Sequence, residues 1–216
     1  MTKCLSLCTA AAAVAAALLS TASEAAELPM RQSQANMVVL ATPGVPTRDV
    51  EFTGWSSSFV SGRDVARTHA SAQCDQPERE WSELLQRRVG TELQEAFKDE
   101  LAQANYSSSV NASRPALSVS AFLNDFDMQM CHVGVGGWHG GFYVQVTWKV
   151  QDASSGRVLY EASTDGSYKS TGVQTTPAAA GLREAVSVAV RNLLSERRFV
   201  SVLQPQAASA SLLALE

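Results

Sequence analysis

The chain has little histidine and lacks the sequence motifs of common hydrolases and nucleotide-binding proteins. Only three of its 216 residues are histidines. A serine nucleophile needs a base within hydrogen-bond reach, and the sequence contains neither a Gly-x-Ser-x-Gly nor a Gly-Asp-Ser-Gly motif. The glycine-rich run of residues 134–141 lacks the Gly-Lys-Ser/Thr of a phosphate loop, and a strand rather than a helix is predicted after it. We therefore expect no catalytic activity and no cofactor.

Charged residues and long apolar runs are also scarce. Only 18% of the residues are charged, and the formal net charge is -4. This mild acidic balance lacks the basic footprint of a nucleic-acid-binding protein. Beyond the N-terminal segment, no apolar run approaches the roughly 20 residues that a transmembrane helix requires. We expect neither a nucleic-acid partner nor a stable membrane span.

The N-terminus has the three parts of a secretory signal peptide. A lysine precedes an apolar run of small residues over 9–19, and residues 20–26 are rich in side chains that a signal peptidase accepts. The run is too short for a permanent membrane helix, although an uncleaved anchor is the alternative. We expect cleavage near residues 22–26 and a periplasmic or secreted mature chain. A lipid anchor is not expected, because Cys4 and Cys8 both precede the apolar run.

The predicted mature chain keeps two cysteines, Cys74 and Cys131. An even pair in an oxidising compartment predicts a disulfide. Closing a loop of about 58 residues stabilises a fold by roughly 4 kcal/mol in the chain-entropy account. Two buried free thiols are the alternative.

The pattern divides the chain into four parts. A signal peptide over 1–26 is followed by a flexible leader over 27–49, which contains prolines and Gly44. One α+β domain is predicted over 50–203, and an Ala/Ser-rich, loose C-terminal tail over 204–216. The order of elements is strand, helix, three strands, helix and strand. The simplest layer arrangement is a single antiparallel sheet of four to five strands with two helices packed on one face.

Two amphipathic helices are predicted. The first spans about 78–104 and begins at the capping sequence Asp75–Glu78. The second spans about 178–197 and begins at Pro177, and residues 199–203 are predicted to form a short closing strand. Apolar residues recur at three- and four-residue steps along both helices. The stripe of the first helix contains Trp81, Leu84, Leu85, Val89, Leu93, Ala96, Phe97 and Leu101.

A three-stranded meander is predicted between the helices. Residues 117–130 alternate apolar and polar, with a bulge near Asn124–Asp125 that shifts the alternation by one residue. Residues 142–150 alternate strictly and form the clearest strand. After a turn at 152–156, residues 157–168 return as a strand with Val158, Tyr160 and Ala162 facing inward.

The hairpin over residues 144–160 resembles one found in bacterial envelope proteins. It reads V-x-W-x-V-x-D, turns through Ser-Gly and continues as V-L-Y. With the helix over 185–194 and Phe199, this layout resembles the YajG-like and LptE-like accessory proteins over about residues 110–203. Small domains preceding trypsin-like peptidases share it. The resemblance implies a binding or assembly role and no catalytic residue. Those lipoproteins carry a lipidated cysteine, which is not expected here.

The glycine-rich turn carries the predicted binding residues Trp138, His139 and Phe142. An exposed aromatic residue at the tip of such a turn is typical of an interface. The alternative is that Trp138 folds back onto the sheet.

Metal binding is not expected at the polar residues nearby. Asp125, Asp127, Cys131, His132 and His139 are close in sequence, but the two-residue period of a strand places His132 and Cys131 on opposite faces. A disulfide would also consume Cys131, whereas a zinc site normally needs four well-spaced nitrogen or sulfur ligands.

The leading hypothesis is an exported envelope accessory protein without catalytic activity. It would bind a partner protein or an envelope polymer through a sheet edge or through the loop over 131–142. One alternative is an envelope enzyme or metal-dependent protein that uses His132 and His139. Another is a regulatory domain for an exported peptidase.

Overall fold

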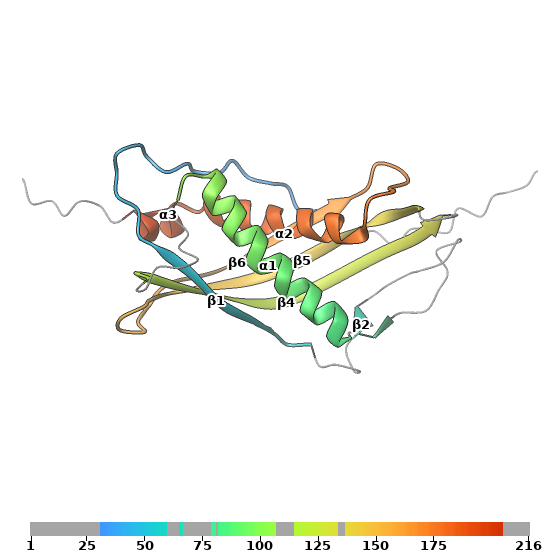
Figure 1. The fold of residues 1–216 in the computed structure, drawn as a ribbon, viewed down its shortest axis with the longest axis horizontal. Coiled ribbons are helices and arrows are strands. Elements are labelled where there is room, and N and C mark those ends of the chain that lie inside the picture. Colours follow the sequence, from blue (N-terminus) through green and yellow to red (C-terminus); the bar gives the residue numbers. More distant parts are fainter. Residues whose placement is uncertain are drawn as a thin grey trace, which may run out of the picture.

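The computed structural model describes residues 31–59, 65–66, 79–80, 82–106, 115–133 and 137–204. A four-stranded sheet in the order β1-β4-β5-β6 forms one layer, and helices cover one of its faces (Figure 1). The strands are β1 (Val50–Ser57), β2 (Val65–Ala66), β3 (Arg79–Glu80), β4 (Leu117–Val133), β5 (Gly137–Asp152) and β6 (Val158–Lys169), and the helices are α1 (Glu83–Gln103), α2 (Ala178–Ser195) and α3 (Arg197–Leu203). The predicted α+β class, with a four-stranded main sheet and helices on one face, is confirmed, and β2 and β3 form a separate two-stranded sheet.

Some predicted features lie outside the described residues. They are the signal peptide over 1–26, Cys74, the helix start at 75–78 and the tail after Gln204.

The sheet is mixed rather than antiparallel throughout. β4, β5 and β6 form the predicted antiparallel meander, but β1 pairs with β4 in parallel. The reason is α1, which lies between β1 and β4 in the chain and acts as a crossover that returns the chain to the same end of the sheet. The predicted bulge in β4 is confirmed by a register shift between Leu123 and Asp125.

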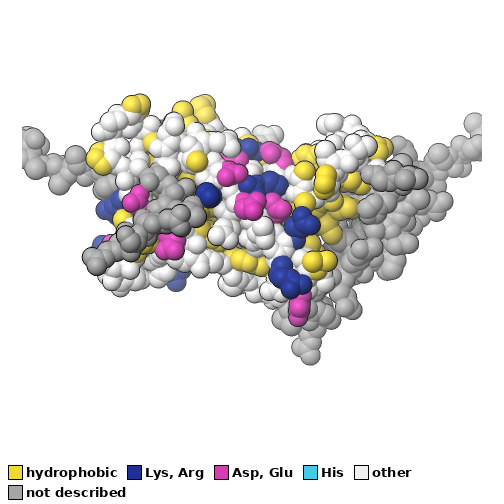
Figure 2. Space-filling view, in the orientation of Figure 1, with side chains coloured by type: hydrophobic (Ala, Val, Ile, Leu, Met, Phe, Trp, Pro, Cys, Tyr) yellow, Lys and Arg dark blue, Asp and Glu magenta, His cyan; other side chains and the backbone are white. Residues whose placement is uncertain are grey.

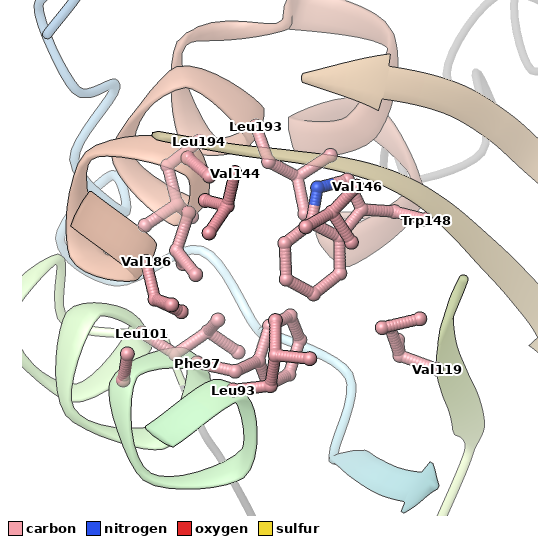
Figure 3. Packing of buried hydrophobic residues seen from close by; sticks show 14 of the residues in the cluster. Leu93, Phe97, Leu101, Val119, Val144, Val146, Trp148, Val186, Leu193 and Leu194 are labelled. Atoms are coloured by element: carbon pink, nitrogen blue, oxygen red, sulfur yellow. The ribbon is translucent and has the colours of Figure 1, made fainter. Parts of the chain in front are cut away.

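The core lies between the helices and the inner face of the sheet (Figure 3). Phe97 of α1 stacks on Trp148 of β5 with ring centroids 5.7 Å apart. The buried indole N–H of Trp148 donates to Thr164 Oγ1 (2.7 Å), and Thr164 donates in turn to the carbonyl of Ala189 (2.8 Å). Side chains from α1, β4, β5 and α2 complete this cluster, among them Leu93, Leu101, Val119, Val144, Val146, Val186, Leu193 and Leu194.

Helix α2 lies unusually close to β6 because of a glycine. A Cβ atom at Gly166 would lie 2.0 Å from the carbonyl oxygen of Ala185 and 2.5 Å from the backbone nitrogen of Ala189. Only the absence of a side chain permits this approach. On the other side of the fold, a Cβ at Gly90 of α1 would lie 2.0 Å from Nε1 of Trp55 in β1.

The predicted start of the first helix is wrong by about five residues. Helix α1 begins at Glu83, because Ser82 caps it by accepting a hydrogen bond from the N–H of Leu85 (3.2 Å). Residues 79–80 instead pair with β2 as a short strand.

The predicted closing strand over 199–203 is also wrong. The second helix ends at Ser195, Glu196 is extended, and α3 begins at Arg197. In α3, Phe199, Val200 and Leu203 are all buried. A strand would instead have turned Ser201 to the same face as Phe199 and Leu203. Helical spacing therefore buries more apolar surface.

One of the three side chains predicted to face inward from β6 does not. Tyr160 is buried and Ala162 packs against the core, but Val158 is 44% exposed. The register pairs Val150 with Tyr160 and Gln151 with Val158, so Leu159 is an extra residue in β6. This irregularity turns Val158 to the other face.

Residues 31–49, predicted as part of a flexible leader, are instead bound to the domain. Backbone N–H groups of Val39, Ala41 and Arg48 donate to carbonyls at the C-terminal ends of α2, α1 and α3, at 2.9–3.1 Å. Such carbonyls have no partner within their own helix, so these bonds satisfy them. We call residues 31–41 the strap. It is drawn in blue along the helix layer in Figure 1.

Candidate functional site

Trp138 does not extend from a loop tip. It is 3% exposed and lies on the inner face of β5. Its indole N–H donates to the carbonyl of Thr176 (2.6 Å), and its ring packs against Phe142 and Tyr168. Phe142 is 1% exposed. Of the two alternatives for Trp138, the structure shows the folded-back one. Trp138 and Phe142 belong to the core beneath α2, so they cannot form the predicted binding surface.

The remaining residues of this hairpin are not brought together as a metal site. The register places His139 opposite Cys131 and His132 opposite Trp138, on different rungs of the ladder. Cys131 is disulfide-bonded. In the described ranges, no group of three or more His, Cys, Asp or Glu side chains could hold a metal ion. Because Cys74 is not described, the pairing of Cys74 with Cys131 stays a prediction.

Ion pairs between α1 and α2 lie on the outer surface of the helix layer. Arg183 of α2 forms ion pairs with Glu92, Glu95 and Asp99 of α1 at 2.7–3.1 Å. Figure 2 shows this mixed cluster of acidic and basic side chains. These ion pairs join the two helices through the single guanidinium of Arg183.

A groove of about 590 Å³ lies on the open face of the sheet, away from the helices. Phe122 is on this face because its neighbours Ala121 and Leu123 point into the core. The lining comes from all four strands of the sheet: Thr53, Gly54, Trp55, Ser56, Ser120, Ala121, Phe122, Thr147, Lys149 and Glu161.

A bulge in β1 shapes one end of the groove. The register with β4 shifts between Phe52 and Gly54. Gly54 has φ 145°, and nothing lies within 4 Å of the position that its Cβ would take. The hydroxyl of Thr53 donates to the carbonyl of Val119 (3.1 Å). The bulge thus leaves open space beside the edge strand.

The groove offers apolar and hydrogen-bonding surfaces side by side. Phe122 is 39% exposed among polar neighbours. The hydroxyls of Ser56 and Ser120 have no partner within the described part of the chain. Lys149 and Glu161 are register partners and supply one charge of each sign. This combination suits an elongated, mostly neutral ligand with an apolar group for Phe122.

Sequence reasoning missed the groove, although two signals point to it. Phe122 is an aromatic residue at a polar position of an otherwise alternating strand. The alternation of apolar and polar residues is also irregular around Trp55, next to the bulge in β1. Neither signal shows that β1 is next to β4, since that pairing is long-range and parallel.

A second polar cluster lies further along the open face. The guanidinium of Arg31 in the strap lies over the ring of Tyr143, with Cζ 5.2 Å from the ring centroid. Its Nη1 is 2.5 Å from Oδ2 of Asp125. Burial raises the pKa of the Tyr143 hydroxyl, although the hydrogen bond from Arg31 opposes this shift. The phenol therefore stays neutral at physiological pH.

Among the helices of the described ranges, none combines the length and the hydropathy that a membrane-spanning segment needs. Comparison with family models and with curated proteins gives no match.

Several solved structures are similar to this chain. A Xanthomonas campestris protein of the family DUF330 is 15% identical, with a TM-score of 0.41, over 74% of this chain and 90% of that one. PelC from Paraburkholderia phytofirmans, crystallised as a dodecamer, is 16% identical, with a TM-score of 0.38, over 76% and 95%. A minor lipoprotein from Acinetobacter baumannii is 8% identical, with a TM-score of 0.32, over 62% and 93%. With TM-scores below 0.5, these similarities transfer no function to this chain. The resemblance to YajG-like and LptE-like proteins stays a prediction.

Proposed function

We propose that this chain is an exported, non-catalytic protein of the bacterial cell envelope that binds a partner protein or envelope polymer in the groove. The observation that carries the proposal is the exposure of Phe122 inside a groove rich in hydroxyl groups, beside an edge strand. Phe122 is the exposed aromatic residue of the proposed binding site, whereas Trp138 and Phe142, predicted to bind, are buried in the core.

Export is supported by the sequence pattern of residues 1–26 and by the disulfide-bonded state of Cys131. We propose cleavage near residues 22–26 and a bridge between Cys74 and Cys131. N-terminal sequencing of protein from the periplasm or medium tests the first point, and intact Met1 would contradict it. Mass spectrometry without reduction tests the second, since the two cysteine peptides should be joined.

Site-specific photocrosslinking tests the groove. A photoreactive phenylalanine analogue is placed at Phe122 in one variant and at Val158 in the control, because both side chains are exposed on the sheet. In envelope extract, we expect a defined adduct from position 122 and none from position 158. Protease treatment of the extract beforehand distinguishes a protein from a polymer. Equal adducts from both positions, or none from position 122, would refute the groove as the binding site.

A further inference from the structure

The strap is bound to one edge of the sheet by a small set of polar contacts centred on Ser33. Its backbone N–H donates to Oγ of Ser167 (2.7 Å), and its hydroxyl donates to the carbonyl of Asp165 (3.1 Å). The hydroxyl of Ser167 also donates to the carbonyl of Ser33 (3.2 Å). These contacts place an extended piece of the chain against β6.

Asn192 of α2 joins the strap to the same edge. Its Oδ1 accepts from the N–H of Asn36 (2.7 Å), and its Nδ2 donates to the carbonyl of Asp165 (2.8 Å) and to the hydroxyl of Ser33 (3.2 Å). Asn192 is itself buried. These bonds hold the strap in one position, because losing any of them would leave a buried polar atom of Asn192 or its partner without a hydrogen bond.

The edge that the strap covers has the geometry of a strand acceptor. β6 is the last strand of the sheet, and within the described residues its ladder partner is β5. The carbonyl of Asp165 points away from β5, since Asn192 and Ser33 donate to it. In an antiparallel strand, the N–H and C=O of one residue point to the same side, and every second residue repeats the direction. Ser163 and Ser167 therefore also present backbone groups outward.

The strap covers this edge without pairing as a strand. Residues 31–41 contain no assigned strand, and the contacts of Ser33 with β6 all use a side-chain hydroxyl. Residues 34–37 are exposed, as are Arg31 and Gln32. An extended segment that formed regular ladder bonds would make more backbone contacts with β6 than the strap does.

We propose that the β6 edge is a binding site for an extended segment of a partner protein, and that the strap is its displaceable cover. This site is the outward edge of β6 at residues 163–167, whereas the groove lies on the open face of the sheet and extends from β1 to Glu161 of β6. The segment adds a strand to β6 through the backbone of residues 163–167. The strap itself indicates the side chains that fit: an arginine two residues before a small hydroxyl residue. Arg31 reaches Tyr143 and Asp125, while Ser33 lies at the edge.

The test uses the full mature chain and a synthetic peptide with the sequence of residues 30–37. In the variant R31A/S33A/N36P the strap loses the groups that anchor it at Tyr143, Asp125 and the β6 edge. Asn192, Ser167, Tyr143 and Asp125, which lie outside the strap, are unchanged. Fluorescence anisotropy then measures binding of the labelled peptide. We expect the variant to bind it at least about tenfold tighter than the wild type, because the wild-type strap competes at high effective concentration. A control peptide with alanine in place of its Arg and Ser should lose this advantage.

Hydrogen exchange locates the bound peptide. Adding the peptide to the variant should slow amide exchange at residues 163–167 and leave residues 50–57 of β1 unchanged. Equal affinity of wild type and variant, equal binding of the two peptides, or no added protection of β6 would each overturn the proposal. Circular dichroism of the variant shows that it is folded. None of these outcomes depends on whether the groove binds a ligand.

Discussion

β1 and β6 are the two edges of the same sheet, and they are protected from unwanted pairing in different ways. β1 contains a bulge at Thr53–Gly54, which interrupts its outward backbone groups. β6 is longer, and the strap lies against it. Exposed edges invite pairing with other chains, so proteins interrupt or cover them. A bulge is a fixed part of the strand, whereas a cover bound by side chains can leave. By this comparison, β6 is the edge at which pairing can be regulated.

The largest expected effect separates an aromatic residue of the core from one of the groove. Trp138→Ala should cost about 3–5 kcal/mol of unfolding free energy, as is typical for a buried aromatic side chain. Phe122→Ser, beside β1, should cost less than about 1 kcal/mol, because Phe122 is partly exposed. Urea unfolding measures both. If Phe122→Ser were as destabilising as Trp138→Ala, the groove would not be an open surface.

The second prediction compares the glycines behind the two edges. Gly166→Ala should cost about 3 kcal/mol, because its Cβ would strike the backbone of α2, which cannot move aside. Gly90→Ala should cost about 1 kcal/mol or less. There the clash is with the side chain of Trp55, which can rotate, and alanine favours the helix by about 1 kcal/mol. Thermal and urea unfolding rank the two variants. The reverse order would mean that α1 holds β1 more rigidly than α2 holds β6.

The third prediction concerns the hold of the strap on β6. Asn192→Ala should cost about 1–2 kcal/mol, since it removes several buried hydrogen bonds. Trypsin should also cleave faster after Arg31, while amide exchange in β1 should not change. Asn192→Asp is the matched variant, because it can still accept from Asn36 but cannot donate to Asp165. It should release the strap only in part. Unchanged cleavage in both variants would show that other contacts hold the strap.

The smallest effect is a pH dependence in the turn before β6. Hydrogen bonds from Ser154 and Ser155 lower the pKa of Asp152 well below its ordinary value of 3.8. A carboxyl group with a lowered folded-state pKa stabilises the fold above its unfolded pKa, and this contribution is lost as the pH falls further. The Tm should therefore fall below about pH 4, and Asp152→Ala should reduce this dependence. An identical acid profile in the variant would show that the turn contributes nothing.

The meander could be predicted because its signals are local. Strict alternation over 142–150 and the turn at 152–156 specify a hairpin, and the shift in alternation near Asn124 locates the bulge in β4. Local signals did not specify where α1 begins or whether residues 199–203 form a strand or a helix. Two candidate caps precede α1, and a short apolar run suits a strand or a helix equally.

The candidate site was harder to predict from the sequence than the fold was. Trp138 in a glycine-rich turn is compatible with exposure or with burial, and only the position of α2 above it decides. The groove depends on the parallel pairing of β1 with β4, across more than sixty residues of chain. The strap depends on contacts such as Ser33 with Ser167, 134 residues apart.

The periods of the helices and strands, the leader pattern and the lack of catalytic motifs follow from the amino-acid sequence alone, because these are properties of neighbouring residues. The exposure of Phe122, the parallel pairing of β1 with β4 and the binding of residues 31–41 to α2 and β6 follow only from the folded structure. Those outcomes result from burial and from hydrogen bonds between distant segments. Their energies depend on which surfaces meet in space, and a local pattern does not specify that.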